Sequence, residues 1–344
     1  MPTEEFITMA HGSGGESTGR LIDEIFAEAF RNPYLEQMED STVVPGAGRL
    51  ALTTDSFVVL PVEYPGGDIG RLCVCGTVND LLMSGAKPAY LTCGFILEEG
   101  LPVETLRRIV RSMAETAKEA GVVIAAGDTK VVEAGQKETG PGLVINTAGV
   151  GLFDGETDNP ALLPQISRIA DGDAVIVSGT LGEHHAAILG ERMGIRHTIR
   201  SDTAPLTEMV QNLKKSGIAL HEMRDVTRGG LATVLHEFAH ASGHRIILEE
   251  QKLPVQPQVR DFCGILGLDP LYMGNEGKMV LLVRAEDADE AVRIMRSSRY
   301  GEGACVIGSV CAAQDGEAGL MLRTGVGGLR VLGPLYGEGL PRIC

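Results

Sequence analysis

The sequence predicts a mixed α/β protein with two α/β domains and a flexible, glycine-rich tail. The first supporting observation is that strand-like apolar segments alternate with helical segments along 344 residues, a length that suits two domains. The second is a stretch rich in turn formers at 155–167, GETDNPALLPQIS, which we expect to separate the domains. We therefore divide the chain into a glycine loop with its helix at 1–35, α/β domains at 36–155 and 156–332, and a tail at 333–344.

Apolar periodicity and terminal residues define the elements of the N-terminal half. Pro102 and Gly121 bound the clearest helix, because proline suits the first helical turn and glycine suits the end. The run VVIAAGDTKVV reads as a buried strand that breaks at Gly127 and leaves polar residues at its end. The predicted order is a glycine loop at 12–15 opening a helix, a strand at 49–59, helices at 70–88 and 102–121, and strands at 122–132 and 142–153.

The C-terminal half repeats this logic. The sequence RDVTRGG places a polar, glycine-containing loop before a helix with apolar residues at helical spacing. The predicted order is a strand at 173–179, a helix near 182–193, a loop at 225–230 opening a helix to 243, a turn and strand at 271–283, a helix at 287–298 and a strand at 303–310.

Composition excludes several classes of function. The net charge is −16, so electrostatic attraction to nucleic acid or to an anionic membrane is not expected. No apolar run approaches the ~18 residues that a membrane span needs. The first residues, MPTEEFITMAHGSGG, are acidic and rich in glycine, unlike a signal peptide. We expect a cytoplasmic protein.

Seven cysteines give an odd number, and no two have CxxC spacing. Six have apolar or small neighbours typical of buried, reduced thiols in a cytosolic protein, namely Cys73, Cys75, Cys93, Cys263, Cys305 and Cys311. Cys344 differs, because it is the last residue of a glycine-rich tail that has nothing nearby to bury it. A free thiol there would be open to oxidation and exchange, so either the tail is incidental or the thiol has a function.

Four aspartates stand at the ends of predicted elements or in polar breaks. Carboxylates from different elements could converge on magnesium, which prefers oxygen ligands and shares them with phosphates and water. Taken singly, an aspartate in such a position is more often a turn or helix-cap residue than a metal ligand. The four are Asp55, Asp80, Asp128 and Asp225.

The sequence HEFAH raises a second metal hypothesis. His236 and His240 satisfy HExxH spacing, but a zinc hydrolase also needs a third ligand and an open cleft. The two histidines fall beside the apolar face of their predicted helix, so we do not favour this interpretation.

Taken together and in order, the motifs resemble the HypE family of hydrogenase maturation proteins over essentially the whole chain. They are HGSGG, TTDSF, GTVNDLLMSGAKP, GDTKVV, RDVTRGG, GNEGK and the terminal PRIC. Most are shared with a wider ATP-using superfamily that includes aminoimidazole ribonucleotide synthetase, selenophosphate synthetase and thiamine-monophosphate kinase; PRIC is the specific signal. Ser13 stands where alanine is expected, and Val226 occupies a variable loop position.

The resemblance implies two α/β domains and a homodimer whose N-terminal sheets join. It also implies that ATP and Mg²⁺ are used to dehydrate a carboxamide on the sulfur of Cys344 to a thiocyanate, the source of cyanide for the iron of nickel–iron hydrogenase. A HypF-like carbamoyltransferase would load the thiol, and a HypC–HypD complex would receive the cyano group.

The resemblance also implies roles for individual residues. Lys130 and Glu276 are candidate bases, although Lys130 also suits an ordinary surface lysine. The four aspartates named above would bind magnesium. Nucleotide-binding roles fall on Gly12, Ser13, Gly14 and Gly15 in the glycine loop, and on Asn79, Thr129 and Arg228.

Two alternatives remain open on the sequence. A small-molecule kinase or selenophosphate synthetase would share the ATP site, but the first has no use for Cys344, and the reactive cysteine or selenocysteine of the second is absent from residues 1–20. A non-enzymatic carrier of the cyano group would carry the tail modification without consuming ATP. An arm from Gly333 to Cys344 could span at most about 40 Å.

Overall fold

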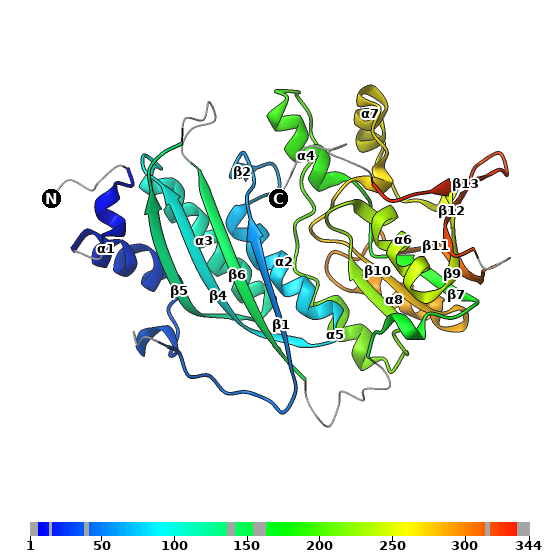
Figure 1. Ribbon diagram of the computed structural model, residues 1–344, viewed down its shortest axis with the longest axis horizontal. Coiled ribbons are helices and arrows are strands. Elements are labelled where there is room, and N and C mark those ends of the chain that lie inside the picture. Colours follow the sequence, from blue (N-terminus) through cyan, green and yellow to red (C-terminus); the bar gives the residue numbers. More distant parts are fainter. Residues whose placement is uncertain are drawn as a thin grey trace.

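The computed structural model describes residues 6–13, 16–37, 41–135, 142–153, 163–313 and 317–335. It contains two large sheets, one in each half of the chain, with helices between and around them (Figure 1). The predicted boundary at 155–167 and the predicted tail lie partly outside the described residues. No helix in the described part is long and apolar enough to cross a membrane.

The N-terminal sheet has four strands in the order β1-β6-β4-β5, with β4 and β5 parallel and the other pairs antiparallel. Its strands are β1 Leu50–Phe57, β4 Lys87–Glu98, β5 Val123–Val132 and β6 Leu143–Leu152. Helices α2 (Ile69–Met83) and α3 (Val103–Ala120) pack side by side on one face (Figure 1). Asp68 caps α2 by accepting the Arg71 N–H, and Gly121 ends α3 in the left-handed conformation.

Short elements complete this half of the chain. The first ones lie along the outer edge of the sheet, beside β5 (Figure 1). They are η1 Met9–Gly12, α1 Glu16–Leu21, η2 Ile22–Ala27 and η3 Leu35–Gln37; a small hairpin follows β1, formed by β2 Glu63–Tyr64 and β3 Gly67–Asp68.

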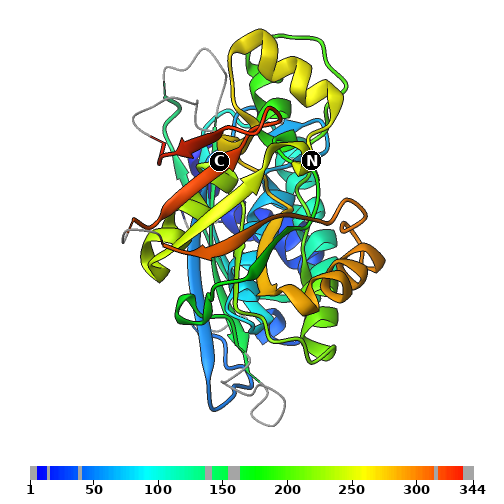
Figure 2. The same cartoon turned by 90° about the vertical axis from the view of Figure 1, so that its right-hand side faces the viewer.

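The C-terminal sheet has seven strands in the order β13-β12-β9-β11-β7-β10-β8, antiparallel except for β9 with β12. Figure 2 shows its strands in front of the N-terminal half. The strands are β7 Asp173–Val177, β8 Glu222–Asp225, β9 His244–Glu249, β10 Met279–Arg284, β11 Cys305–Ala312, β12 Gly319–Arg323 and β13 Leu329–Leu332. The helices are α4 Glu183–Arg192, α5 Thr207–Lys215, α6 Gly230–Ser242, α7 Pro257–Leu266 and α8 Ala288–Ser297, with single turns η5 Ile166–Arg168, η6 Glu250–Lys252, η7 Pro270–Tyr272 and η8 Ala285–Asp287.

One hydrophobic core joins the two halves. It runs from the helix-covered face of the N-terminal sheet through α2, α3, α5 and α8 to one face of the C-terminal sheet. A second core lies on the opposite face of the C-terminal sheet, under α6. Arg71 reinforces the junction, because its guanidinium donates to the Thr203 carbonyl at 2.8 Å, to Glu119 at 2.8 Å and to the Tyr300 hydroxyl at 3.1 Å.

The structure corrects the sequence prediction at two strands. The strand predicted at 122–132 does not break at Gly127, because β5 continues its parallel pairing with β4 from Gly127 opposite Cys93 to Val132 opposite Glu98. The segment 87–98, which the sequence analysis did not assign, is β4 and occupies the interior of the sheet. The helix predicted to reach residue 88 ends at Met83, and Lys87 already begins β4.

His185 on α4 makes stability dependent on pH. Burial, with His184 and Arg192 nearby, lowers the pKa of His185 to about 4. The unfolded chain therefore takes up a proton before the folded one does, and we expect a loss of about 3 kcal/mol of stability as the pH falls from ~6.5 to 4. The variant His185→Gln should show a shallower loss over this range in urea unfolding, whereas the exposed control His240→Gln should follow the wild type. Parallel profiles for wild type and His185→Gln would contradict this assignment.

Candidate functional site

Three of the four predicted aspartates gather where the two sheets meet. Asp55 lies on β1, Asp80 near the end of α2, and Asp225 at the end of β8. Helix α2 contacts both β1 and β8, which brings these elements together. Asp80 is held in place by the Thr53 hydroxyl, which donates to its Oδ2 at 2.9 Å.

Burial raises the pKa of all three carboxyls, and repulsion between carboxylates adds to the rise at Asp80 and Asp225. For Asp225 burial is the main cause, with Asp80 adding to it, and its pKa rises to about 7. Burial also raises the pKa of Asp55 and of Asp80, and the Asp55 charge adds to the rise at Asp80. Such a group of desolvated carboxylates is stabilised by any cation that binds among them.

Glu276 and Arg228 belong to the same electrostatic neighbourhood. Burial raises the pKa of Glu276 well above its usual range, with further increases from Asp225, Asp202 and Asp55, while Arg228 opposes the shift. Arg228 also lowers the pKa of Asp55. We call Asp55, Asp80, Asp225, Glu276 and Arg228 the junction cluster.

The loop 225–230 and the turn 275–278 support each other through the backbone. The Val226 N–H donates to the Lys278 carbonyl at 2.9 Å, and the Asn275 N–H donates to the Val226 carbonyl at 2.9 Å. A Cβ on Gly230, whose φ is 66°, would meet the Leu271 carbonyl oxygen at 2.5 Å. Glycine is therefore required where this loop passes η7 and enters α6.

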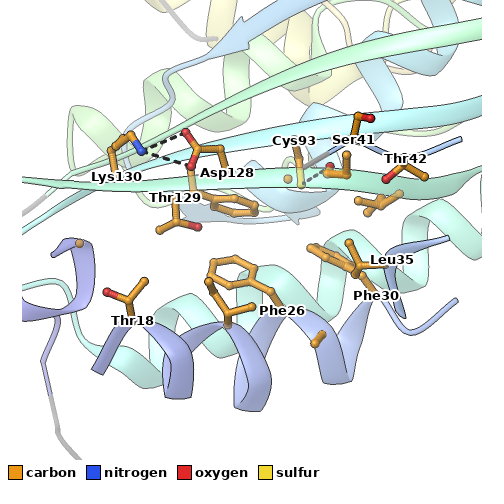
Figure 3. Close-up of a pocket in the computed structure, with 17 residues that line it drawn as sticks. Thr18, Phe26, Phe30, Leu35, Ser41, Thr42, Cys93, Asp128, Thr129 and Lys130 are labelled. Carbon is orange, nitrogen blue, oxygen red and sulfur yellow. Dashed lines mark hydrogen bonds and ion pairs between the residues drawn. The ribbon is translucent and has the colours of Figure 1, made fainter. Parts of the chain in front are cut away.

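Four of the other predicted residues line a separate pocket of about 430 Å³ at the outer edge of the N-terminal sheet. Figure 3 shows it between the helical turns that carry Phe26 and Phe30 and the strands that carry Cys93 and Thr129. Gly12, Asp128, Thr129 and Lys130 line it as well. The Lys130 ammonium contacts both carboxylate oxygens of Asp128 at 3.3 Å, and both side chains are largely exposed.

Gly12 packs closely on this edge, because a Cβ there would lie 2.9 Å from the Val131 Cβ. The Ser13 hydroxyl donates to the Ala10 carbonyl at 2.9 Å, which shapes the turn. Gly14, Gly15 and Cys344 lie outside the described residues.

Within one chain the pocket and the junction cluster are well separated. β1 and β5 are the two edges of the sheet, about 14 Å apart over three strand spacings. Asp55 lies in register with Thr147, Cys93 and Gly127, whereas Asp128 lies in the next row, with Asn146 and Gly94. Side chains alternate between faces along a strand, so Asp128 and Asp55 project from opposite faces. Asp128 thus does not join the other three aspartates in a single chain.

Asn79 has a structural role in the fold. Its side-chain amide donates to the Ala204 carbonyl at 3.0 Å and accepts the Leu206 N–H at 2.9 Å, with the side chain buried. It thus ties α2 to the segment that precedes α5, and its amide group is engaged by protein backbone. The sequence interpretation of Asn79 as a nucleotide ligand receives no support from this geometry.

The structure does not support a zinc site at HEFAH. The rings of His236 and His240 lie 4.3 Å apart, centroid to centroid. Over the described ranges no three His, Cys, Asp or Glu side chains form a group that could hold a metal ion by themselves.

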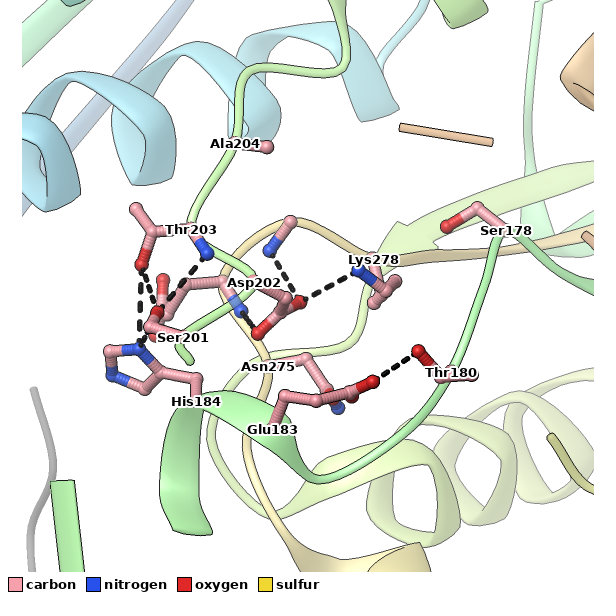
Figure 4. A network of polar contacts seen from close by, with 12 residues as sticks. Ser178, Thr180, Glu183, His184, Ser201, Asp202, Thr203, Ala204, Asn275 and Lys278 are labelled. Atoms are coloured by element: carbon pink, nitrogen blue, oxygen red, sulfur yellow. Dashed lines mark hydrogen bonds and ion pairs between the residues drawn. The ribbon is translucent and has the colours of Figure 1, made fainter. Parts of the chain in front are cut away.

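Sequence reasoning missed a buried polar network behind Glu276, shown in Figure 4. Asp202 and Lys278 form an ion pair at 3.2 Å, almost fully withdrawn from solvent. The Thr180 hydroxyl donates to Glu183, and the His184 Nδ1 lies 2.8 Å from the Ser201 hydroxyl. The sequence feature that could have predicted this network is the group of polar residues in GEHH, SDT and GNEGK, each of which lies beside an apolar run.

Comparison with known proteins places this geometry in a family. The model of the AIR synthase related protein, N-terminal domain, matches residues 38–153, and that of the C-terminal domain matches residues 170–320. The chain is 46% identical to carbamoyl dehydratase HypE of Cupriavidus necator, over 98% of this chain and 95% of the relative. It is 45% identical to carbamoyl dehydratase HypE of Escherichia coli, over 98% and 99%.

Solved structures agree with this placement. A hydrogenase maturation protein HypE in complex with ATP superposes with a TM-score of 0.90 at 43% identity, over 98% of this chain and 99% of that one. The HypE chain of a HypE–HypF complex gives a TM-score of 0.77 at 45% identity, over 92% and 99%. A thiamine-monophosphate kinase from Stenotrophomonas maltophilia, 21% identical with a TM-score of 0.65 over 87% and 96%, shares the fold alone. The chain therefore belongs to the carbamoyl dehydratase HypE family, within the AIR synthase related proteins.

Proposed function

We propose that this chain uses ATP to dehydrate a carboxamide carried on the sulfur of Cys344, leaving a thiocyanate on that sulfur. The observation that supports this most strongly is the full-length similarity to carbamoyl dehydratases, at 45–46% identity, in a chain that carries Cys344 within the motif PRIC. The product would supply cyanide to the iron of nickel–iron hydrogenase. A reducing cytosolic compartment would keep the Cys344 thiol free.

The chemistry explains the need for ATP. An amide oxygen is a poor leaving group, so the carboxamide oxygen attacks the γ-phosphorus of ATP and ADP departs. The resulting imidate phosphate, S–C(=NH)–O–PO₃, then loses phosphate as the C–O bond breaks. Over the two steps nitrogen gives up two protons to bases, and S–C≡N remains. The chain must therefore position the phosphates, neutralise their charge and provide a base.

The outer-edge pocket is the proposed nucleotide site. Its apolar floor, which includes Phe26 and Phe30, suits a flat base, and the polar residues Thr129 and Lys130 suit phosphate or ribose. Gly12 lines the pocket, and the turn that contains it is closed by Ser13, whose N–H and hydroxyl both donate to the Ala10 carbonyl. A relative of 43% identity has been solved in complex with ATP.

The junction cluster is the proposed Mg²⁺ and reaction site. Magnesium usually takes only one or two protein carboxylates and completes its shell with phosphates and water, so the junction aspartates need to supply only part of that shell. Bound there, the ion would neutralise phosphate charge. Asp55, Asp80 and Asp225 would hold it. Glu276 would accept a proton from the carboxamide nitrogen, and Arg228 would orient phosphate.

A homodimer would unite the two halves of the site. The face of the N-terminal sheet opposite α2 and α3 exposes apolar side chains, including Leu52, Ile96 and Val132. Asp128 and Lys130 project from this same face. Pairing two such faces would cover the apolar residues. With β5 of one chain beside the edge strand β1 of the other, it would carry Asp128 and Lys130 past that edge toward the junction cluster of the other chain.

Two partners are proposed for the tail. A HypF-like carbamoyltransferase would load Cys344, in keeping with the solved complex between a HypE relative and HypF. A HypC–HypD complex would take the cyano group. A tethered cysteine can visit both and return to its own site, with an effective concentration of about millimolar order.

Mass analysis of the wild type and of a Cys344 variant distinguishes an ATP-dependent dehydratase from a non-enzymatic carrier of the cyano group. We expect Cys344→Ala to fold and to bind ATP as the wild type does, while forming no cyano adduct. Mass spectrometry of the C-terminal peptide, after incubation with a carbamoyl donor system, should show an ATP-dependent loss of one water in the wild type and in the control Cys311→Ala. Loss of water without ATP would favour the alternative that the chain is a non-enzymatic carrier. A cyano adduct on another residue of Cys344→Ala would contradict the hypothesis that Cys344 carries the substrate.

Mixing two inactive variants tests the composite site. Asp225→Asn and Lys130→Ala should each be inactive alone. In a heterodimer of the two, one site holds both substitutions and the other holds neither. Random subunit exchange should therefore restore about a quarter of wild-type activity. If both groups act within a single chain, mixing will restore nothing.

The dependence of folding stability on pH and on Mg²⁺ tests whether Asp225 belongs to the proposed metal site. Because its pKa is raised to about 7, the folded chain loses stability as the pH rises from ~4 through 7, where the buried carboxyl ionises. In metal-free buffer at pH 8 we expect Asp225→Asn to be more stable than the wild type, and to lose the stabilisation that Mg²⁺ with an ATP analogue provides. The surface variant Glu237→Gln serves as control. Equal stabilisation of Asp225→Asn and wild type by Mg²⁺ would exclude Asp225 as a ligand.

A further inference from the structure

We propose that Asp202 is a positioning residue, which fixes Glu276 by binding the turn 276–278 with its carboxylate. The inference rests on the proposed function in one respect, the role of Glu276 as a base. Whether Asp202 restrains the turn can be measured by amide hydrogen exchange, independently of activity.

Three contacts join the Asp202 carboxylate to this turn. Oδ1 accepts the Glu276 N–H at 3.3 Å, and Oδ2 accepts the Gly277 N–H at 3.1 Å. Oδ2 also contacts the Lys278 ammonium at 3.2 Å. Figure 4 shows the Asp202 carboxylate paired with the Lys278 ammonium. One carboxylate thus binds three consecutive residues and restricts the backbone from which the Glu276 side chain projects.

The backbone around Asp202 is pressed against the same turn. The Ala204 N–H donates to the Glu276 carbonyl at 3.3 Å. A Cβ on Gly277 would lie 2.0 Å from the Asp202 carbonyl oxygen, so only glycine allows this approach. The segment 202–204 and the turn therefore form one packed unit.

A carboxylate is the group that this environment requires. Asp202 is 5% exposed and Lys278 10%, so the charges are desolvated and each depends on the other. The Lys278 stem is confined, because a Cβ on Gly179 would lie 2.9 Å from its Cε. An asparagine at 202 would offer one acceptor oxygen to three donors and would turn its own NH₂ toward them.

The position of Glu276 matters because many groups face it. Its carboxyl interacts with groups on β1, β2, α2, the loop 225–230 and the 202 segment, namely Asp55, Tyr64, Cys75, Asp202, Asp225 and Arg228. A shift of the turn by a fraction of an ångström would alter all of these interactions and the distance to a reacting nitrogen. Catalytic rates are sensitive to displacements of this size.

The test uses the full-length protein with Asp202→Asn and two readouts. Hydrogen exchange should show the Glu276 and Gly277 amides exchanging about tenfold faster or more. The kcat for ATP-dependent dehydration should fall by about tenfold or more, with KM for ATP within about twofold of wild type. Unchanged exchange at these two amides would overturn the proposal.

Asp173→Asn is a matched control. Asp173 is also buried, accepts the Ala170 N–H at 2.9 Å and pairs with His221 at 2.8 Å, but it lies at the far end of β7. We expect this variant to lose stability while keeping wild-type kcat and wild-type exchange at residues 276 and 277. If kcat falls equally in both variants, the effect of Asp202 is general destabilisation and the proposal fails.

A double-mutant cycle with Glu276→Gln asks whether Asp202 acts through Glu276. Once Glu276 is replaced, adding Asp202→Asn should lower kcat no further, whereas additive losses would contradict the inference. If Glu276→Gln keeps wild-type kcat, the proposed base is wrong, and the exchange result alone decides whether Asp202 holds the turn. Should Asp202→Asn fail to fold, Asp202→Glu keeps the charge but misplaces the carboxylate. Its kcat should then be lower than in wild type, and the Glu276 and Gly277 amides should exchange faster than in wild type.

Discussion

The burial of α2 between the two sheets is the constraint on which the rest of the structure depends. Nearly all of its residues are buried, against β1, β4 and β6 on one side and β8 and α5 on the other. Because both domains pack on this single helix, its polar residues lie at the junction by necessity. Asp80 joins the acidic residues there, while Asn79 and Arg71 secure the neighbouring backbone of residues 203–206.

The same burial creates the electrostatic character of the site. Asp55, Asp80, Asp225 and Glu276 are withdrawn from water close to one another, which raises the pKa of each. In water such a cluster would repel with little consequence, but in a desolvated junction it favours a cation or a retained proton. This is the property that phosphate chemistry with a metal ion and a general base requires. Burying these carboxylates close together lowers the stability of the fold at the junction.

The polar network behind Glu276 also consists of buried charged groups. Asp202 and Lys278 lie where a buried charge without a partner would be costly, yet together they restrain a turn that carries a reactive side chain. The outer-edge pocket, proposed as the nucleotide site, lies on the far edge of the N-terminal sheet with exposed polar residues at its rim. The proposed reaction site is thus buried and the proposed binding edge is open, and the proposed dimer would bring the two together.

The sequence by itself determined the local elements and the chemistry. Pro102, Gly121 and apolar periodicity predicted α3 closely, and the ordered motifs predicted the family that the comparisons confirmed. Only the tertiary structure decided that β5 continues through Gly127, that Asn79 binds backbone, that Asp128 lies apart from Asp55, and that Asp202 reaches Glu276. The reason is physical. Helix and strand patterns arise from neighbours a few residues apart. Strand order and buried polar contacts join residues much farther apart in the chain, from 34 positions for Cys93 and Gly127 to 125 positions for Asn79 and Ala204.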